Sequence, residues 1–428
     1  MMQKTPKYVA ALFLGIASVG ALSMGVSAVA VAADDKDKPK VSKAAQKPLK
    51  AAQEAIEAKN YPDALAKLKE VQGMSGLEPY DTYLMNELLG FAYVRTGDYP
   101  EAAKALEASL NTPYFKEEDK PQRVKALAQV NYQIKNYDKA VEYGEKVIAA
   151  GNGDEDMYTL VSQAYYVKGD YKGAWKFTND WVEKQIKEGK TPKEQPLQLV
   201  MSSCVKLSDE ACTSKALEKM VAYYPKPEYW QNIVYTLLQA QTTGQDKSML
   251  NVYRLAVEVD ALKRADDYTE AAQLAIEQGS PGEAVRILEK GFAKNAFTDQ
   301  RIKERNQRLL ESAKKQSAID QASLSKIEKD GATAKTGDKD VSLGLAYLSY
   351  EQYPKAIDAF NRGLAKGSVR NEAEARLLLG IAQLKAGNKS EATKTFEQVK
   401  GNPTLERLAN LWTLHAKQPP VQQALIAK

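Results

Sequence analysis

The feature that most constrains the fold of this chain is a short turn that recurs along its 428 residues. Each copy is Gly-Asp-Tyr or a similar tripeptide, and an alanine follows three residues after the tyrosine. The first four copies are spaced by 38, 38 and 34 residues. Self-similarity at a period of this size predicts a stack of equivalent structural units in place of one globular core. The tyrosines of these turns are Tyr61, Tyr99, Tyr137, Tyr171 and Tyr353.

The residues on both sides of each turn predict a pair of antiparallel helices. Apolar side chains recur there at i, i+3, i+4 and i+7, so each helix carries one apolar stripe. Gly90 and Ala128 on first helices are small enough to let the second helix approach closely, as are Ala102 and Ala140 on second helices. Because one hairpin cannot bury both of its stripes, neighbouring hairpins must stack, and we expect an all-α solenoid.

The spacing of small and aromatic residues resembles the tetratricopeptide repeat family. Three segments carry its pattern, namely Leu89-Gly90…Tyr93…Ala102…Leu106…Pro113, Leu343-Gly344…Tyr347…Ala356…Phe360 and Leu379-Gly380…Ala392…Phe396…Pro403. Units that begin near residues 45, 121, 155 and 265 match well, whereas those near 194 and 227 match in one helix only. The resemblance implies a right-handed superhelical solenoid of antiparallel helix pairs.

We therefore expect one continuous solenoid of about ten units over residues 49–403. The longest gap in the pattern is 72 residues, twice 36, so residues 300–330 are expected to hold a degenerate repeat. Leu309, Leu310 and Ala322 would occupy its framework positions. Residues 404–417 are predicted to form a capping helix, with residues 418–428 as a tail.

The N-terminus has the pattern of an export signal. Lys4 and Lys7 precede 23 residues without a charge, and Ala-x-Ala sites for a signal peptidase stand at the end of this stretch. The pattern predicts a cleaved signal peptide at residues 1–33 and a bacterial periplasmic location, with a lysine-rich linker at residues 34–48. The alternative is an uncleaved inner-membrane anchor, because 23 helical residues are just long enough to span a bilayer.

The count of reactive side chains argues against catalysis. The chain has one histidine and two cysteines, too few for a zinc site made of His and Cys ligands. His415 alone would have to serve any Ser-His-Asp or Cys-His arrangement. We therefore expect no enzyme activity, no metal and no cofactor. A net charge of +5 is small for this length and gives no reason to expect a nucleic-acid partner.

The two cysteines are expected to flank one hairpin turn, with Cys204 late in a first helix and Cys212 early in its partner. In an oxidising compartment two such thiols favour a disulfide. Loop entropy assigns a bridge of this length about 2.5 kcal/mol of stability. The alternative is a pair of independent buried thiols.

The family resemblance also implies a binding face, because first helices line the concave side of this superhelix. An aromatic, amide and basic lining suits a peptide groove, since aromatic and arginine side chains contribute much of the binding energy at interfaces. A merely solvated inner face is the alternative. Lys125 with Gln129 matches the family's Lys-x-x-x-Asn carboxylate clamp only imperfectly, so we do not transfer that ligand. The residues that would point inward are Phe91, Val94, Arg95, Lys125, Gln129, Tyr132, Gln133, Gln163 and Tyr166.

Together these features predict a periplasmic scaffold or adaptor that binds protein or peptide partners of the cell envelope. Two short segments, Leu84–Gly90 and Tyr224–Trp230, are similar to periplasmic repeat proteins that accompany TonB/ExbB/ExbD-type systems, which implies a role in outer-membrane transport. A second hypothesis is an adaptor in envelope assembly or one associated with peptidoglycan. A third is a hydrolase on an α-superhelical scaffold. A list of partners and an activity screen would distinguish them.

Overall fold

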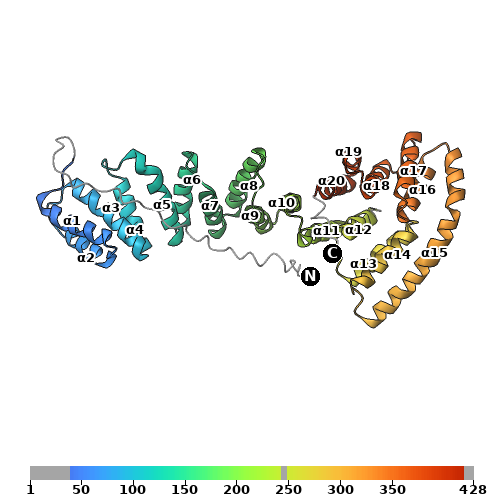
Figure 1. The fold of residues 1–428 in the computed structure, drawn as a ribbon, viewed down its shortest axis with the longest axis horizontal. Helices are drawn as coiled ribbons and strands as arrows, with labels where there is room; N and C mark the ends of the chain where they lie inside the picture. The colour runs from blue at the N-terminus through green and yellow to red at the C-terminus, as the bar shows by residue number, and fades with distance from the viewer. Residues whose placement is uncertain (1–38, 242–247, 419–428) are drawn as a thin grey trace. The chain divides into compact units, whose positions relative to one another are not determined.

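The computed structural model describes residues 39–241 and 248–418, and in these two ranges it contains 20 α-helices and no strand (Figure 1). Most helices pack against the next one in the chain, so helical hairpins follow one another along the molecule. The predicted all-α fold of stacked helix pairs is therefore confirmed. Across the described ranges, each helix is too short or too polar to span a membrane.

The helices fall into two compact units, Met1–Ala216 and Leu217–Lys428, whereas the sequence predicted one continuous solenoid. The first unit contains α1 (Lys43–Glu57), α2 (Tyr61–Gln72), α3 (Pro79–Thr96), α4 (Tyr99–Leu110), η2 (Glu117–Asp119), α5 (Lys120–Gln133), α6 (Tyr137–Ala149), α7 (Glu155–Val167), α8 (Tyr171–Lys187) and α9 (Glu194–Lys206). The boundary lies within α10 (Glu210–Tyr223). The second unit continues with α11 (Pro227–Gln241), α12 (Met249–Glu258), α13 (Ala265–Glu277), α14 (Pro281–Ala293), α15 (Gln300–Thr333), α16 (Asp338–Ser349), α17 (Tyr353–Lys366), α18 (Glu372–Lys385), α19 (Lys389–Glu397) and α20 (Pro403–Lys417).

The recurring turn is a helix end closed by a residue in the left-handed conformation. The next residue donates its N–H to a carbonyl five residues back, as Asp98 does to Tyr93 at 2.9 Å and Asp170 to Tyr165 at 3.0 Å. This bond is the signature of a Schellman end, which satisfies carbonyls that the helix leaves open. Asp170 also caps the following helix, because its side chain accepts the N–H of Gly173 at 2.8 Å. The left-handed residues of the turns are Lys59, Gly97, Lys135, Gly169 and Glu351, with φ between 57° and 87°.

Close contact between the two helices of a hairpin explains the Leu-Gly pairs. A Cβ added at Gly90 would lie 2.5 Å from Leu106 of the second helix, and one added at Gly344 would lie 2.8 Å from Phe360. Gly380 has the same relation to Phe396. Leu106 and Phe360 are fully buried, so they cannot move outward to make room.

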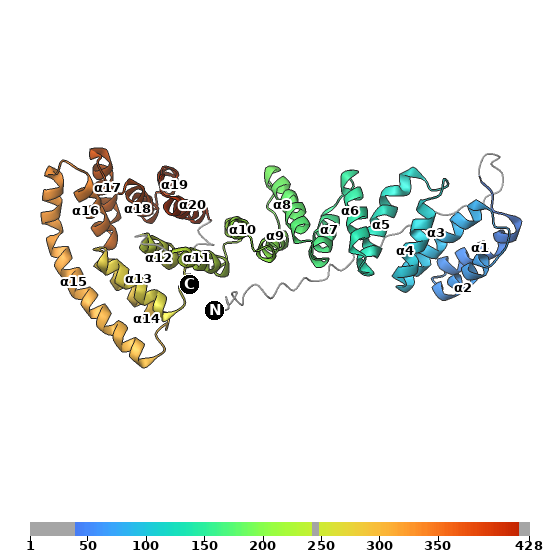
Figure 2. The ribbon, with the colours of Figure 1, turned by 180° about the vertical axis from the view of Figure 1, so that it is seen from behind.

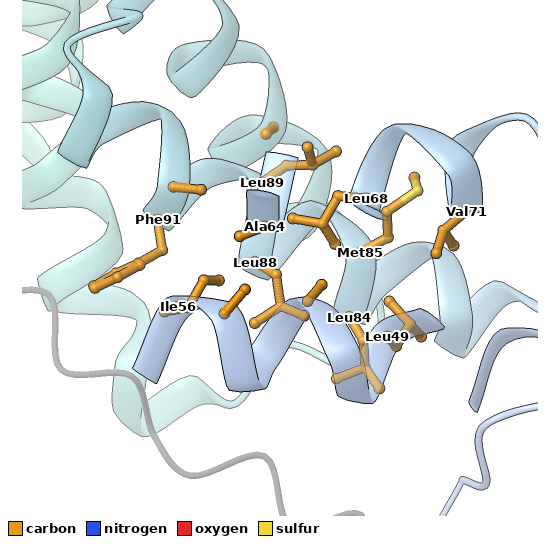
Figure 3. Close-up of a cluster of buried hydrophobic side chains, with 14 of the residues drawn as sticks. Leu49, Ile56, Ala64, Leu68, Val71, Leu84, Met85, Leu88, Leu89 and Phe91 are labelled. Carbon is orange, nitrogen blue, oxygen red and sulfur yellow. The ribbon is translucent and has the colours of Figure 1, made fainter. Parts of the chain in front are cut away.

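Each group of neighbouring helices encloses its own apolar cluster. In the first one, Leu49 and Ile56 of α1 meet Leu68 of α2 and Leu84 and Leu88 of α3 (Figure 3). Separate clusters lie among α3, α4 and α5 and among α5, α6 and α7. The core of the first unit is therefore built from local clusters that repeat along the array, as expected for a solenoid.

The predicted degenerate repeat at residues 300–330 is wrong, because these residues belong to a single helix, α15, of 34 residues (Figure 2). No proline or glycine occurs between Gln300 and Asp330, so nothing in the sequence ends the helix earlier. Leu310 is buried, but Ala322 is exposed and so does not take the buried framework position that the repeat would give it.

The ends of the array differ slightly from the predicted boundaries. α1 begins at Lys43, inside the predicted linker 34–48, because Ser42 caps it by accepting the N–H of Ala45 at 3.3 Å. The predicted capping helix 404–417 is α20, which begins one residue earlier at Pro403. The signal peptide 1–33 and residues 419–428 of the predicted tail lie outside the described residues.

Cys204 and Cys212 are joined by a disulfide, with their Cα atoms 5.5 Å apart. The turn between them has the same form as the others, although it lacks the Gly-Asp-Tyr sequence. Ser208 is left-handed with φ 55°, and Asp209 donates its N–H to the Cys204 carbonyl at 3.1 Å. The bridge thus spans a Schellman end whose left-handed residue is not glycine, a conformation that costs about 1–2 kcal/mol for an L-residue.

We expect Gly90→Ala to destabilise the first unit. In a helix interior, replacing glycine by alanine normally raises the free energy of unfolding by up to about 1 kcal/mol. Here the added methyl group is overpacked against Leu106, which lowers the free energy of unfolding by about 1–3 kcal/mol. Thermal unfolding followed by circular dichroism should show a lower midpoint. Gly73→Ala is the matched control in the same unit, because its Cβ would meet nothing closer than 3.6 Å. A Gly90→Ala protein as stable as the control would contradict the close-contact explanation.

The disulfide predicts that protein purified from an oxidising compartment contains no free thiol after unfolding without reductant, and two after reduction. Reduction should also lower the stability of the α9–α10 hairpin by about 2.5 kcal/mol, because the unfolded chain regains loop entropy. Thiol titration and denaturant unfolding, each with and without reductant, measure the two effects. Two free thiols in the native protein would be the contrary result.

Candidate functional site

The predicted binding residues of α3 divide into buried and exposed ones. Phe91 and Val94 are buried, at 9% and 8% exposure, and pack in the apolar clusters of the first unit. Their assignment to a partner-binding face is therefore corrected, because the neighbouring hairpins already cover them. Arg95 is exposed, and its guanidinium lies 5.0 Å from the centre of the Phe91 ring.

The predicted residues of α5 keep partial exposure. Lys125 makes an ion pair with Asp154, the residue that caps α7 by accepting the N–H of Met157 at 3.0 Å. Burial alone would raise the pKa of Asp154, but the bonds from Lys125 and Met157 outweigh it and lower that pKa. Lys125 thus joins two hairpins, and Gln129 and Gln133 are the partly exposed amides among the predicted residues of this helix.

Hydrogen bonds connect successive first helices in a ladder. The Tyr132 hydroxyl of α5 donates to Gln163 Oε1 of α7 at 3.3 Å. The Tyr166 hydroxyl of α7 is 2.8 Å from the Ser202 hydroxyl of α9. Burial, followed by the nearby Tyr137, raises the pKa of Tyr132, so its hydroxyl is neutral at physiological pH and remains able to donate.

Gln163 itself is buried, at 2% exposure, so its prediction as a surface contact is also corrected. Its side chain borders a small cavity of about 10 Å³, which is also lined by Ser162 and Trp181. Such a space is about the size of one water molecule and is too small for a peptide side chain. Gln163 therefore holds the Tyr132 hydroxyl through a hydrogen bond from within the packed region and does not face a partner.

Four tyrosines form what we call the aromatic strip, which consists of Tyr132, Tyr137, Tyr166 and Tyr171, all of them partly exposed. Within it, each turn tyrosine packs edge-on against the tyrosine five residues earlier. The ring centres are 5.6 Å apart for Tyr132 and Tyr137, and 5.2 Å apart for Tyr166 and Tyr171. Tyr61 also packs edge-on against an aromatic ring, at 6.3 Å, but this ring is Phe91 on α3 of the next hairpin, so the five-residue pairing belongs to the two hairpins of the strip.

The strip has basic and amide side chains beside it. Lys206 of α9 lies 5.9 Å from the centre of the Tyr171 ring. Gln129 and Gln133 lie on the same helix as Tyr132, and Arg95 holds the equivalent place one hairpin earlier. The arrangement offers ring faces, hydroxyl groups, amides and cations, which bind peptides without covalent chemistry. Among the residues that the structure describes, no three His, Cys, Asp or Glu side chains gather where they could hold a metal.

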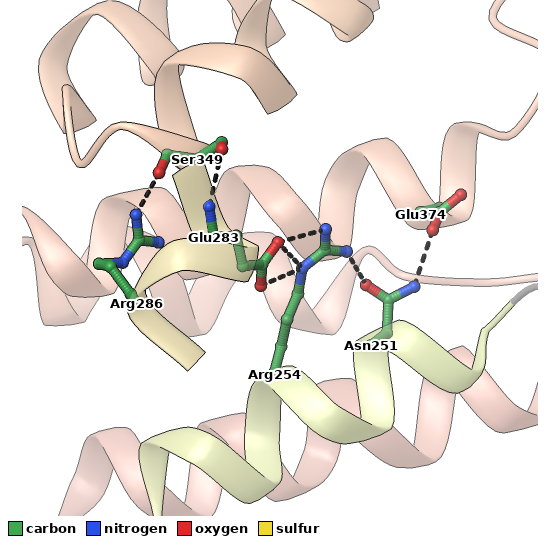
Figure 4. Close-up of polar contacts among 6 residues, drawn as sticks. All are labelled: Asn251, Arg254, Glu283, Arg286, Ser349 and Glu374. Carbon is green, nitrogen blue, oxygen red and sulfur yellow. Dashed lines mark hydrogen bonds and ion pairs between the residues drawn. The ribbon is translucent and has the colours of Figure 1, made fainter. Parts of the chain in front are cut away.

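Sequence reasoning missed a buried polar network in the second unit (Figure 4). Arg254 donates to Glu283 at 2.9 and 3.0 Å and to Asn251 at 2.7 Å, and Asn251 donates to Glu374 at 2.7 Å. The partners are 29 and 123 residues apart in sequence, so no local pattern connects them. A signal did exist, because Asn251 and Arg254 are polar residues three apart in a helix whose first nine residues are otherwise apolar or aromatic.

Two segments of the chain match the model of the tetratricopeptide repeat family, residues 49–114 and residues 341–404. The first lies in the N-terminal unit and the second in the C-terminal unit. They include all three segments on which the resemblance was based most strongly. A search of curated proteins found no match.

A search of solved structures gives matches, and two of those named here are described as tetratricopeptide repeat or repeat-containing proteins. A tetratricopeptide repeat protein from Parabacteroides merdae is 12% identical over 80% of this chain and 100% of its own, with a TM-score of 0.30. The C-terminal part of a repeat-containing protein from Cytophaga hutchinsonii is 14% identical over 60% and 98%, with a TM-score of 0.29. Yeast Tom70 is 12% identical over 90% and 99%, with a TM-score of 0.23. Because these TM-scores are below 0.5, we transfer no ligand or partner from them. The matched segments and the helix pairs they form identify the chain as an all-α protein that carries tetratricopeptide repeats in both of its units.

Proposed function

We propose that this protein is an exported scaffold that binds a protein or peptide partner through the aromatic strip of its first unit. The observation that carries the proposal is the repeated pairing of partly exposed tyrosines on α5–α8, with cations and amides beside them. Tyrosine and arginine are the side chains that most often dominate binding energy at interfaces. Tyrosine also supplies contact area at a low cost in side-chain entropy.

The strip is held in place before a partner arrives. Tyr132 and Tyr166 are each bonded to the next first helix, and each is packed against a turn tyrosine. Side chains that are already ordered lose less entropy on binding, which favours affinity. This support is what the buried Gln163 and Ser202 contribute to the surface.

The periplasm is the compartment that we propose, on the basis of the N-terminal sequence and the disulfide. Residues 1–33 have the charge and apolar pattern of a cleaved signal, and structural disulfides persist in oxidising compartments. Retention of the segment as an inner-membrane anchor is the alternative. Both versions place the repeats outside the cytoplasm.

Among envelope partners, a component of a TonB/ExbB/ExbD-type system is the narrower hypothesis, and an adaptor for envelope assembly or peptidoglycan is the alternative. The two segments behind the narrower hypothesis contain Leu84, Leu88 and Trp230, which are buried core residues. Their similarity therefore concerns the framework of the repeat and does not by itself define a contact. The identity of the partner has to come from experiment.

Lys206→Glu combined with Gln133→Glu should abolish partner binding, because two carboxylates would be placed beside the aromatic strip. Affinity purification of the tagged full chain from crosslinked envelope fractions, followed by mass spectrometry, measures the loss. Lys176→Glu, a charge reversal at an exposed position of the second helix α8, is the matched control and should retain every partner. Equal recovery from both variants would rule out the strip as the binding surface.

Export predicts that the mature protein begins near residue 34 and is found with periplasmic markers after osmotic shock. N-terminal sequencing of the released protein checks both points. Replacement of Lys4 and Lys7 by glutamate should leave the precursor in the cytoplasm, because the signal peptide loses its positively charged n-region. An intact N-terminus in the membrane fraction would support the anchor, and cytoplasmic wild-type protein would contradict export altogether.

A further inference from the structure

The second unit closes on itself. α20 packs against α12, which precedes it by eight helices (Figure 1). In an open solenoid each repeat contacts only its neighbours. Polar bonds hold the closure, since Glu258 of α12 meets His415 of α20 at 3.3 Å and also pairs with Lys385 of α18. The closed array therefore has an interior that an open one lacks.

This interior is a cavity of about 360 Å³, bordered by α12, α14, α18, α20 and the turn between α16 and α17. Pockets for small molecules commonly measure about 300–1,000 Å³. The cavity is therefore large enough for a compact organic molecule, and it lies entirely within one unit.

The lining has an apolar part and a charged part. Four aliphatic side chains and one indole make up the apolar part, namely Val257, Ile287, Leu348, Ile381 and Trp412. The charged part includes the Arg254–Glu283 pair, whose side chains are only 5% and 14% exposed. Each of the three guanidinium nitrogens of Arg254 bonds to Glu283 or Asn251, and the side chain is almost fully buried, so this pair supports the wall and offers little to a ligand (Figure 4).

Three other cations border the cavity, and one of them, Lys290, donates to the Val257 carbonyl and pairs with Asp260. The side chains of Arg286 and Lys385 are 38% and 37% exposed, and both border the cavity. Arg286 donates to the Ser349 carbonyl and pairs with Glu351 at 3.4 Å, whereas Lys385 pairs with Glu258. A guanidinium has five N–H donors and an ammonium has three, so both retain donors after these contacts.

The apolar part also contains an indole N–H. Trp412 is 1% exposed, and within the described residues its Nε1–H has no acceptor at hydrogen-bond distance. An indole N–H can only donate, and leaving it buried without an acceptor costs free energy. This nitrogen has almost no accessible surface, so a ligand in the cavity meets the ring of Trp412 and does not reach its N–H.

We propose that the closed second unit binds a small organic anion with an apolar body, a carboxylate or sulfonate on an aromatic or branched aliphatic group. The anionic group accepts hydrogen bonds from Arg286 and Lys385, and the body packs on Ile287, Ile381 and Trp412. This site is separate from the aromatic strip of the first unit. The inference therefore goes beyond the scaffold function and does not depend on it.

The test uses two fluorescent probes on the full chain. 8-Anilinonaphthalene-1-sulfonate has an aromatic body and an anionic group, and N-phenyl-1-naphthylamine has the same rings without the sulfonate. We expect the sulfonate to bind at one saturable site per chain. The neutral probe should bind at least about tenfold more weakly, the equivalent of one charged hydrogen bond.

The double variant Arg286→Met with Lys385→Met should lose affinity for the sulfonate by at least about tenfold. Its matched control is Arg308→Met with Lys315→Met, the same chemical changes at exposed positions of α15, which does not border the cavity. The control should bind like the wild type. Leu348→Trp, which fills the cavity, should remove binding of both probes, and circular dichroism checks that each variant is folded.

Each result decides the proposal in one direction. Equal affinity of the wild type for the two probes would overturn the assignment of an anion, whether or not the variants fold. Sulfonate binding that is absent, has many sites, or is equally strong in the cation variant and the control would overturn the site. One site that discriminates between the probes and depends on the two cations would support it.

Discussion

The whole architecture depends on how closely the two helices of each hairpin approach. Gly90, Gly344 and Gly380 have no side chain, and the space beside them holds Leu106, Phe360 and Phe396. In each case the large residue follows the glycine by 16 positions, so the second helix always lies in the same register on the first. Hairpins of one shape can stack repeatedly, whereas hairpins of variable shape could not. The apolar clusters, the ladder of hydrogen bonds and the aromatic strip all follow from this regular stacking.

Most of the first unit could be predicted because its determinants are local. A left-handed residue, a cap and an alanine three positions after the tyrosine lie within seven residues of one another, and together they define the turn and the start of the second helix. α15 could have been predicted for the same reason, since an absence of glycine and proline over 30 residues is also a local fact. A repeat needs a turn between two helices, and residues 300–330 contain no residue that would end a helix, so the spacing of 72 residues does not imply a repeat there.

The candidate binding residues were predicted less well than the helices. Phe91, Val94 and Gln163 were placed on a surface but are buried, because a first helix packs against its own partner and also against neighbouring hairpins. The periodicity of apolar residues in one helix indicates the face that packs against its own partner. It does not indicate the face that packs against the neighbouring hairpin. Tyr132 and Tyr166 are partly exposed because their hydroxyls need polar partners at the edge of the packed region. Burial at a second interface is a property of the stack, so no single helix sequence displays it.

The closure of the second unit could not be predicted from local sequence. Its contacts join residues 123 and 157 positions apart, such as Asn251 with Glu374 and Glu258 with His415. Burial would raise the pKa of Glu258, but hydrogen bonds from His415 and Lys385 dominate and lower it to about 2. A carboxylate with a lowered pKa stabilises the folded state above its unfolded pKa, and this contribution is lost only as the pH falls towards 2. Glu258 is therefore ionised near neutral pH, and its bonds to His415 and Lys385 across the closure of the second unit are not lost by protonation there. α20 therefore packs against α12 as the closing wall of the second unit, in addition to covering the last repeat.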